Sequence, residues 1–276
     1  MTHKNRPSLV VFFPLLLLVG CGSIPERELS DVDSVYIILP NGNDPMNPDQ
    51  PKYAATGGLS SEGENLVRAL ERAKGRPLNI LSLSGGGQNG AFGAGFLIGW
   101  RESGTRPQFD AVGGVSTGAL LATHALLGTP EDDARLKEMY TQVTAEDIYK
   151  PRSVFALLKS DSLMDTTPLQ EMIAEYITEE TLERVAAAFD EGRFIAVGTT
   201  NIDYEQTWIW NLSLVAKDGN LDLYRKVLLA SASFPIVFPP VEINGHLFVD
   251  GAARSNLVVP GPVSYTHLRA HETVVR

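Results

Sequence analysis

The sequence predicts an α/β fold in which a mostly parallel central sheet is flanked by helices. Two observations lead to this class. Short apolar runs bounded by turn-forming residues, which are typical of buried strands, alternate with longer stretches that have the period of a helix. The composition, with 43% hydrophobic and 20% charged residues in a chain of 276, is that of a globular protein. Strands separated by helices usually run parallel within one sheet.

The apolar runs and the helical stretches follow one another in a regular order. The first helix ends at Gly75, and a buried strand follows it. The strand at 206–212 is expected to pair with the strand at 194–199 as a hairpin. The expected strands are 35–39, 78–83, 109–115, 194–199, 206–212 and 247–250, and the expected helices are 66–73, 91–100, 117–127, 130–143, 168–188 and one that closes at 226–231.

Residues 1–20 have the layout of a signal peptide. Lys4 and Arg6 give a positive start, and an apolar run without any acidic residue follows. The run ends in Leu18-Val19-Gly20-Cys21, which resembles the lipobox of bacterial lipoproteins. This resemblance implies that the chain is cut before Cys21 and that the thiol of Cys21 is diacylated.

Residues 21–60 are expected to form the acylated cysteine and a tether. The segment 41–51 is dense in Asn, Asp, Gly and Pro, a composition that predicts neither a helix nor a central strand. Gly22 follows Cys21 where an Asp could stand, and in proteobacterial lipoproteins this implies sorting to the outer membrane. We therefore expect a protein of the bacterial cell envelope, held on the membrane by acylated Cys21.

The formal net charge of −10 and the single cysteine exclude several classes of protein. An acidic chain with no basic stripe is not expected to bind nucleic acid. One cysteine cannot form an intramolecular disulfide or a cysteine-cluster metal site, and no other spacing of metal ligands occurs. We expect neither a metal nor another cofactor.

The globular domain is expected to span residues 61–262. Residues 263–276 have no periodicity that fits it and resemble translated sequencing adapter. We therefore expect a non-native tail there, and a domain that is truncated at its C-terminal end. In this interpretation His267 and His271 do not belong to the protein.

A G-x-S-x-G motif, Gly114-Val115-Ser116-Thr117-Gly118, lies between an expected strand and an expected helix. This spacing lets a serine sit on a sharp strand-to-helix turn, because small flanking residues permit the strained backbone and expose the hydroxyl. The N-terminus of a helix also favours negative charge that develops on the oxygen. Ser116 is therefore the candidate nucleophile.

A glycine-rich loop, Gly85-Gly86-Gly87-Gln88-Asn89-Gly90, follows the strand at 78–83. Consecutive glycines let backbone N–H groups approach an anion, which suits an oxyanion hole. The same residues fit the G-x-G-x-x-G dinucleotide fingerprint, with Asp110 as the later carboxylate. A ribose-binding carboxylate should end a strand, however, whereas Asp110 begins one. An oxyanion hole is favoured over a nucleotide site and over a purely structural turn.

Asp250 ends the expected strand at 247–250 and is followed by Gly251 and Ala252. In an open α/β sheet, a carboxylate at this position would face the same edge as the other two motifs, where such sheets place their sites. Asp250 is thus the third candidate site residue.

A serine nucleophile needs a base, yet no histidine of this chain is well placed. His124 is eight residues past Ser116, about 12 Å along one helix, which is too far for a hydrogen bond. His246 is expected at the opposite end of a short strand from Asp250. The residues therefore point to a dyad in which Asp250 itself is the base.

Together the three motifs resemble those of the patatin-like phospholipases. The resemblance covers about residues 76–262 and includes the further stretches 165–169, 197–201 and 230–240. It implies a three-layer α/β sandwich and a serine lipid acyl hydrolase, of phospholipase A or lysophospholipase type, that needs no metal. The family's mechanism implies that Ser116 attacks the ester of a phospholipid or another acyl lipid, that Asp250 accepts the proton, and that the oxyanion is held by Gly85, Gly86 and Gly87.

Two positions depart from the family pattern. Many members carry Arg or Lys where Asn89 stands, and Asp-Gly-Gly where this chain has Asp250-Gly251-Ala252. Loss of the cation would weaken help for the oxyanion or for a lipid phosphate. Two alternatives stay open: a catalytically weak surface lipoprotein that binds lipid or a partner, and a Ser-His-Asp esterase whose histidine lies in the missing C-terminus.

Overall fold

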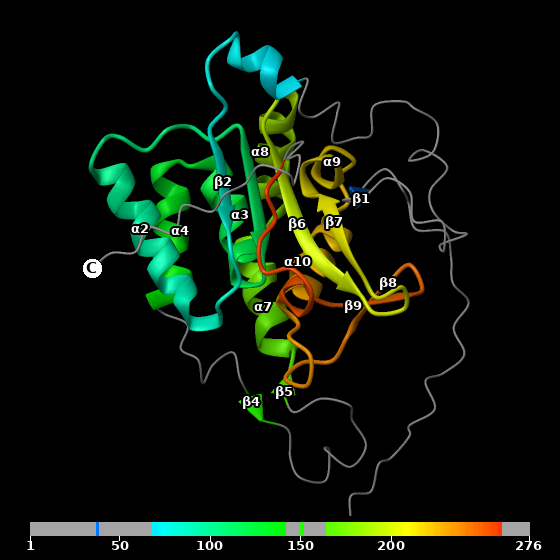
Figure 1. Cartoon of the computed structure of the whole chain (residues 1–276). Coiled ribbons are helices and arrows are strands. Elements are labelled where there is room, and N and C mark those ends of the chain that lie inside the picture. The colour runs from blue at the N-terminus through cyan, green and yellow to red at the C-terminus, as the bar shows by residue number, and fades with distance from the viewer. Residues whose placement is uncertain (1–36, 39–67, 142–149, 152–163, 261–276) are drawn as a thin grey trace, which may run out of the picture.

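The computed structural model describes residues 37–38, 68–141, 150–151 and 164–260. A seven-stranded sheet runs through the centre, and helices pack beside it (Figure 1). This arrangement confirms the predicted class, a mixed α/β fold with a central sheet and flanking helices. The main path of neighbouring strands is β1 (Ile37–Ile38), β7 (Gln206–Asn211), β6 (Phe194–Asn201), β3 (Ala111–Val115) and β2 (Ile80–Leu83).

The strands that carry the candidate motifs meet at β6. β2, β3 and β6 run parallel to one another, and β7 pairs antiparallel with β6, which confirms the expected hairpin. β9 (His246–Asp250) pairs antiparallel with residues 199–201 of β6, and β8 (Val241–Ile243) pairs with β9. Because β7 already occupies one edge of β6 at those residues, β9 lies on the same edge as β3.

The helices lie close to the positions expected from the sequence, and residues 68–73 belong to the first expected helix. The helix α9 and the strand β8 were not predicted. The remaining elements are η2 (Gly87–Asn89), α2 (Gly90–Glu102), α3 (Thr117–Leu127), α4 (Pro130–Thr141), β4 (Lys150–Pro151), β5 (Met164–Asp165), α7 (Thr167–Tyr176), α8 (Glu179–Asp190), α9 (Leu212–Lys217), α10 (Leu221–Ala232) and η3 (Gly251–Ala253).

The single helical stretch expected at 168–188 is wrong, because the chain forms two helices there, α7 and α8. Ile177 leaves the helical conformation, with φ −108° and ψ 88°. Thr178 then caps α8, since its side chain accepts a hydrogen bond from the backbone N–H of Thr181 at 3.2 Å. Threonine is a favoured N-cap residue, so local capping here interrupts a continuous helical period.

The two faces of the sheet are covered by different parts of the chain. Val112 and Ile195 are fully buried in the main hydrophobic core, which the helices complete. Side chains alternate between faces along a strand, and on the opposite face Ala196 and Val115 pack with Val258. The segment that follows β9 therefore crosses the sheet directly over the ends of β3 and β6 (Figure 1). Within the described ranges, no helix combines the length and apolar character needed to cross a membrane.

Candidate active site

Ser116 occupies a sharp turn between β3 and α3. Its backbone has φ 55° and ψ −126°, a combination that is rare for a residue with a side chain. The turn is possible because both motif glycines lie against backbone. A Cβ on Gly114 would come within 2.6 Å of the carbonyl oxygen of Gly118, and one on Gly118 within 2.2 Å of that of Leu83. The expected strand–turn–helix context of the motif is present.

The sheet register brings Ser116 and Asp250 together. Val115, the last residue of β3, pairs with Gly198 of β6, and Asp250, the last residue of β9, pairs with the next residue, Thr199. β3 runs parallel to β6 and β9 runs antiparallel to it, so the C-terminal ends of β3 and β9 meet head to head on one edge. The Ser116 hydroxyl consequently lies beside the Asp250 carboxylate, close enough to stabilise its charged form.

The Asp250 carboxylate is almost fully removed from water, with 1% of the residue exposed. Burial raises the pKa of Asp250 above its ordinary value, although hydrogen bonds from Ser116 and from the N–H of Ala252 act in the opposite direction. The Ala252 N–H lies 2.8 Å from Oδ1. The backbone N–H of Asp250 donates to the carbonyl oxygen of Ser233 at 2.9 Å. A desolvated carboxylate is a better proton acceptor than an exposed one.

The glycine-rich loop lies against the serine. A Cβ on Gly85 would fall 2.8 Å from the Cβ of Ser116 and 2.5 Å from Oδ1 of Asn256, so only glycine fits without displacement. Asn256 makes two hydrogen bonds to the backbone of Gly85. The Gly85 N–H donates to the Asn256 carbonyl oxygen at 3.4 Å, and Asn256 Nδ2 donates to the Gly85 carbonyl oxygen at 3.3 Å.

Gly86 and Gly87 open the next turn of the loop. Gly86 is the N-cap of η2, and Gly87 is its first residue, with φ 54°. The N–H groups at the start of a helix have no partner within it, so they are available to an anion. Asn89 lies in the same turn and donates its N–H to the Gly86 carbonyl oxygen at 3.0 Å. An amide therefore stands beside the loop where many members of the family carry a cation.

Three residues that contact the candidate site were not predicted from the sequence. The Ser231 Oγ accepts a hydrogen bond from the backbone N–H of Ser116, and the carbonyl oxygen of Ser233 accepts one from the backbone N–H of Asp250. Asn256 makes two hydrogen bonds to the backbone of Gly85. Ser231 and Ser233 lie within the stretch 230–240, whose resemblance to the family was the available signal. Their specific contacts depend on how β9 inserts beside β6, which local sequence does not encode.

The excluded histidines lie outside this site, as expected. His124 is buried in α3, with its Nδ1 3.0 Å from Oδ1 of Asp132. His246 begins β9, at the opposite end of that strand from Asp250, and its ring contacts those of Tyr204 and Trp208.

The dinucleotide interpretation is not supported. The Asp110 carboxylate is paired with Arg72 and Arg76, at 2.5 and 2.6 Å, just before β3 begins. Asp110 is therefore at the opposite end of this strand from Ser116. Among the residues that the structure describes, no three His, Cys, Asp or Glu side chains are grouped so as to hold a metal ion.

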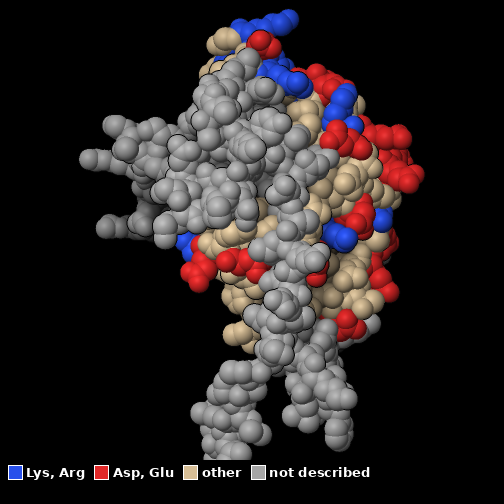
Figure 2. All heavy atoms as spheres, turned by 90° about the vertical axis from the view of Figure 1, so that its right-hand side faces the viewer, with Lys and Arg blue, Asp and Glu red and all other residues tan. Residues whose placement is uncertain are grey.

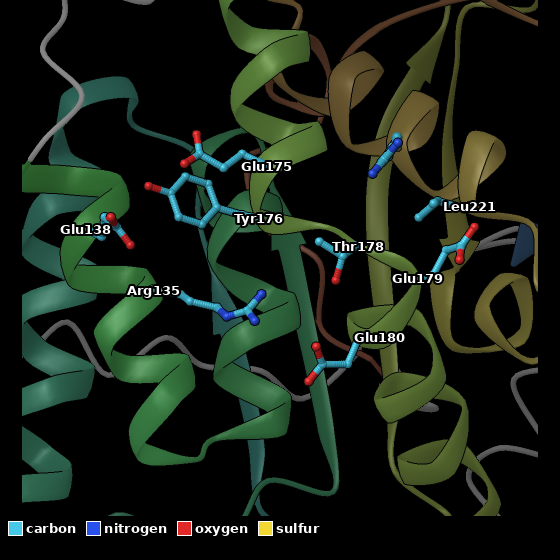
Figure 3. A pocket seen from close by; sticks show the side chains of 9 residues that line it. Arg135, Glu138, Glu175, Tyr176, Thr178, Glu179, Glu180 and Leu221 are labelled. Atoms are coloured by element: carbon cyan, nitrogen blue, oxygen red, sulfur yellow. The ribbon is translucent and has the colours of Figure 1, made fainter.

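A large surface cavity of about 730 Å³ lies elsewhere, among the helices (Figure 3). Its lining mixes both signs of charge, including Arg135 on α4, Glu175 on α7 and Glu180 on α8. Arg225 of this lining donates to the carbonyl oxygen of Ile177, and so satisfies the end of α7. None of the candidate site residues lines this cavity, and its charged walls do not suit an acyl chain.

Fold and site define an α/β protein that carries a serine on a nucleophile elbow, beside a buried carboxylate. The chain belongs to the patatin-like phospholipase family, whose family model matches residues 81–262. Cys21 and residues 263–276, on which the lipidation and tail predictions depend, lie outside the described residues.

Two individual proteins show the range of similarity. The chain is 24% identical over 179 residues to uncharacterized protein R571 of Acanthamoeba polyphaga mimivirus, covering 64% of this chain and 58% of the relative. It thus spans less than two thirds of that relative. The crystal structure of VipD from Legionella pneumophila matches with a TM-score of 0.45 and 15% identity, over 65% of this chain and 46% of that one.

Proposed function

We propose that this chain is a serine lipid acyl hydrolase, of phospholipase A or lysophospholipase type, in which Ser116 and Asp250 form a catalytic dyad. The observation that carries the proposal is the sheet register that brings the Ser116 hydroxyl, on a strained turn, beside a carboxylate that is 1% exposed. Family membership supports a lipid ester as the substrate. The geometry of the site supports the catalytic roles that we propose for these two residues.

In the first half-reaction Ser116 Oγ attacks the ester carbonyl carbon while Asp250 accepts the hydroxyl proton. The tetrahedral intermediate then collapses, its carbon–oxygen bond to the lipid alcohol breaks, and Asp250 returns the proton to the leaving oxygen. The alcohol departs, and an acyl ester remains on Ser116.

In the second half-reaction water replaces the alcohol. Asp250 takes a proton from the attacking water, and the new oxygen–carbon bond forms a second tetrahedral intermediate. This intermediate expels Ser116 Oγ, which regains the proton from Asp250, and the fatty acid leaves. One carboxylate thus serves alternately as base and acid, which requires the raised pKa that burial gives it.

The negative charge on the carbonyl oxygen needs donors on the glycine loop. We assign this role to the N–H groups of Gly86 and Gly87, at the start of η2. The N–H of Gly85, also expected as a donor from the sequence, is directed at the carbonyl oxygen of Asn256. Gly85 contributes instead by allowing the loop to approach Ser116 closely.

The direct contact between Ser116 and Asp250 favours the dyad over a Ser-His-Asp esterase. In a triad the imidazole lies between the serine and the carboxylate and bonds to both. Here the hydroxyl lies directly beside the carboxylate, so an imidazole from elsewhere would have to separate the two groups.

We also propose that the mature chain begins at Cys21 and is anchored by lipid in the bacterial envelope, in the outer membrane of a Gram-negative host. The lipobox-like end of the apolar run supports this. Acyl chains on one cysteine hold a protein on a membrane when two or more are present. Mass spectrometry of the N-terminal peptide tests the assignment, since Cys21→Ala should abolish both cleavage and the lipid mass.

The hydrolase proposal is tested by labelling the full chain with a fluorophosphonate. We expect one adduct on the peptide that contains Ser116, absent in Ser116→Ala and retained in Ser103→Ala, which removes an exposed serine at the end of α2. No adduct on a folded protein would contradict the proposal and favour the lipid-binding alternative. Asn89→Arg would then show whether a cation at that position restores labelling.

A further inference from the structure

Large apolar side chains are exposed on segments that adjoin the candidate active site. Among the described residues, the large hydrophobic side chains that are well exposed are Leu70, Ile80, Phe92, Phe96, Ile202, Phe234, Ile236 and Leu257. Five of these lie on segments that also contact the site. We call these five the apolar rim: Phe92, Phe96, Phe234, Ile236 and Leu257.

Two of the rim residues are next in sequence to residues that hydrogen-bond to the site. Phe234 follows Ser233, whose carbonyl oxygen accepts the N–H of Asp250. Leu257 follows Asn256, which is bonded to Gly85 through its side chain and its carbonyl oxygen. These two rim residues are therefore held close to the candidate site by their chain neighbours.

The third part of the rim is the first half of α2, which begins directly after the glycine loop. Phe92 is 78% exposed and stacks on Phe96 one turn later, with ring centroids 6.4 Å apart. The segments after β2, α10 and β9 begin at the same end of the sheet (Figure 1). The rim thus comes from three chain segments that meet around Ser116.

These segments also carry very little charge. The chain has 33 Asp and Glu residues, but none lies in 84–100, 227–241 or 251–260, where Arg254 is the single charged residue. Elsewhere carboxylates are common on the surface, as the face shown in Figure 2 illustrates. An apolar surface without carboxylates avoids repulsion from anionic lipid headgroups.

Ile236 supplies an independent observation. It is 73% exposed and has φ 74°, a conformation that is a clear outlier for a β-branched residue. Strained residues of this kind cluster at functional sites, where the surrounding structure holds them. Here the strained residue exposes an isoleucine side chain to solvent, three residues after Ser233.

We propose that the apolar rim docks on the surface of a phospholipid bilayer and seats the mouth of the Ser116 site at the boundary between headgroups and acyl chains. The choice of a lipid surface rests on the proposed function, whereas the position of the contact rests on the rim itself. This contact is distinct from the anchor at Cys21. The anchor holds the chain near the membrane, and the rim orients the site toward it.

The test measures insertion at single positions. The full chain with Ser116→Ala, which prevents turnover, receives Phe92→Trp or Phe234→Trp, and Leu70→Trp serves as the matched exposed control away from the site. Fluorescence is recorded with phosphatidylcholine vesicles whose acyl chains carry bromine, a quencher confined to the apolar layer. We expect the fluorescence of the added tryptophan to be quenched at least about twofold more strongly in the two rim variants than in the control. The reason is that inserted residues reach the acyl region.

Equal quenching in all three variants would overturn the proposal, because it would indicate contact without a preferred face. Absence of vesicle binding would overturn it as well, and so would binding without quenching at the rim, which would direct attention to a protein partner. Fluorophosphonate labelling separates the two proposals. An adduct without rim quenching leaves the hydrolase intact and removes the docking surface, and rim quenching without an adduct does the reverse.

Discussion

The backbone N–H of Ser116 donates a hydrogen bond to Oγ of Ser231 at 3.0 Å, although 115 residues of sequence separate them. The Ser231 hydroxyl in turn donates to the carbonyl oxygen of Gly198 at 2.7 Å. One buried side chain thus connects the strained turn to β6. Because a positive φ costs free energy at a residue with a side chain, contacts of this kind are needed to hold it.

We expect Ser231→Ala to lower both stability and fluorophosphonate labelling. The change leaves two backbone groups without their partner, at a cost of about 1–3 kcal/mol for each buried unsatisfied group. In a domain of this size, each kcal/mol lowers Tm by about 2–4 °C. Ser233→Ala is the matched control, since its Oγ bonds only to the carbonyl oxygen of Leu229 in its own helix. Equal losses of Tm and labelling in both variants would contradict the role given to Ser231.

The main elements were predictable from the sequence because their signals are local. The motif around Ser116 has its strand and helix at the expected residues, and Asp250 ends its strand as expected. The exclusion of His124 by helix geometry agrees with its pairing with Asp132. Each of these inferences used only spacing within one or two adjacent elements.

The contacts that complete the site were not predictable in this way. Ser231 and Asn256 reach the site because β9 pairs with β6 at the point where β3 ends. This pairing joins segments that are far apart in the sequence, so local patterns do not predict it. The break at Ile177 was missed because a threonine cap interrupted an apolar pattern that continues through it. The distribution of exposed apolar residues around the site also appears only once the three segments are brought together.

We expect Gly85→Ala to abolish labelling of Ser116. A Cβ there would lie 2.8 Å from the Cβ of Ser116 and 2.5 Å from Asn256 Oδ1, so the loop must move away from the serine. Gly95→Ala is the control, because a Cβ at that position on α2 meets no atom within 4 Å. Alanine in a helix is favoured over glycine by about 1 kcal/mol, so this control should label normally and melt slightly higher. Normal labelling of Gly85→Ala would show that the close approach is unnecessary.

The pH dependence of kcat/KM on a water-soluble ester should report Asp250. Protonated Asp250 cannot accept the serine proton, so activity falls as the pH drops through its pKa. Burial raises that pKa, which places the acid limb above the ordinary range of about 3.9 for an Asp. Asp250→Asn should lower kcat/KM by about 10²–10⁴-fold. Asp250→Glu should move the limb, and a limb that stays in place would identify another group as the base.

The same raised pKa makes Asp250 costly to the fold, and this leads to a prediction on stability. When the pKa in the folded state lies above the pKa in the unfolded state, the folded protein favours the protonated carboxyl. The contribution of this group to folding stability is therefore fully present below the unfolded-state pKa, and it is lost as the pH rises through the folded-state pKa. Asp250→Asn keeps the shape without the charge. We therefore expect a higher Tm than that of the wild type at pH 7 and a difference that disappears near pH 4.

Asp222→Asn, at an exposed carboxylate that pairs with Lys226 four residues later, is the matched control for this comparison. It should change Tm little at either pH, because exposed ion pairs contribute about 0–1 kcal/mol. If Asp250→Asn gains stability at pH 7 and loses catalysis, the buried charge of Asp250 destabilises the fold but is needed for the reaction. If Asp250→Asn instead melts lower at pH 7, the hydrogen bonds from Ser116 and Ala252 to the carboxylate outweigh its desolvation.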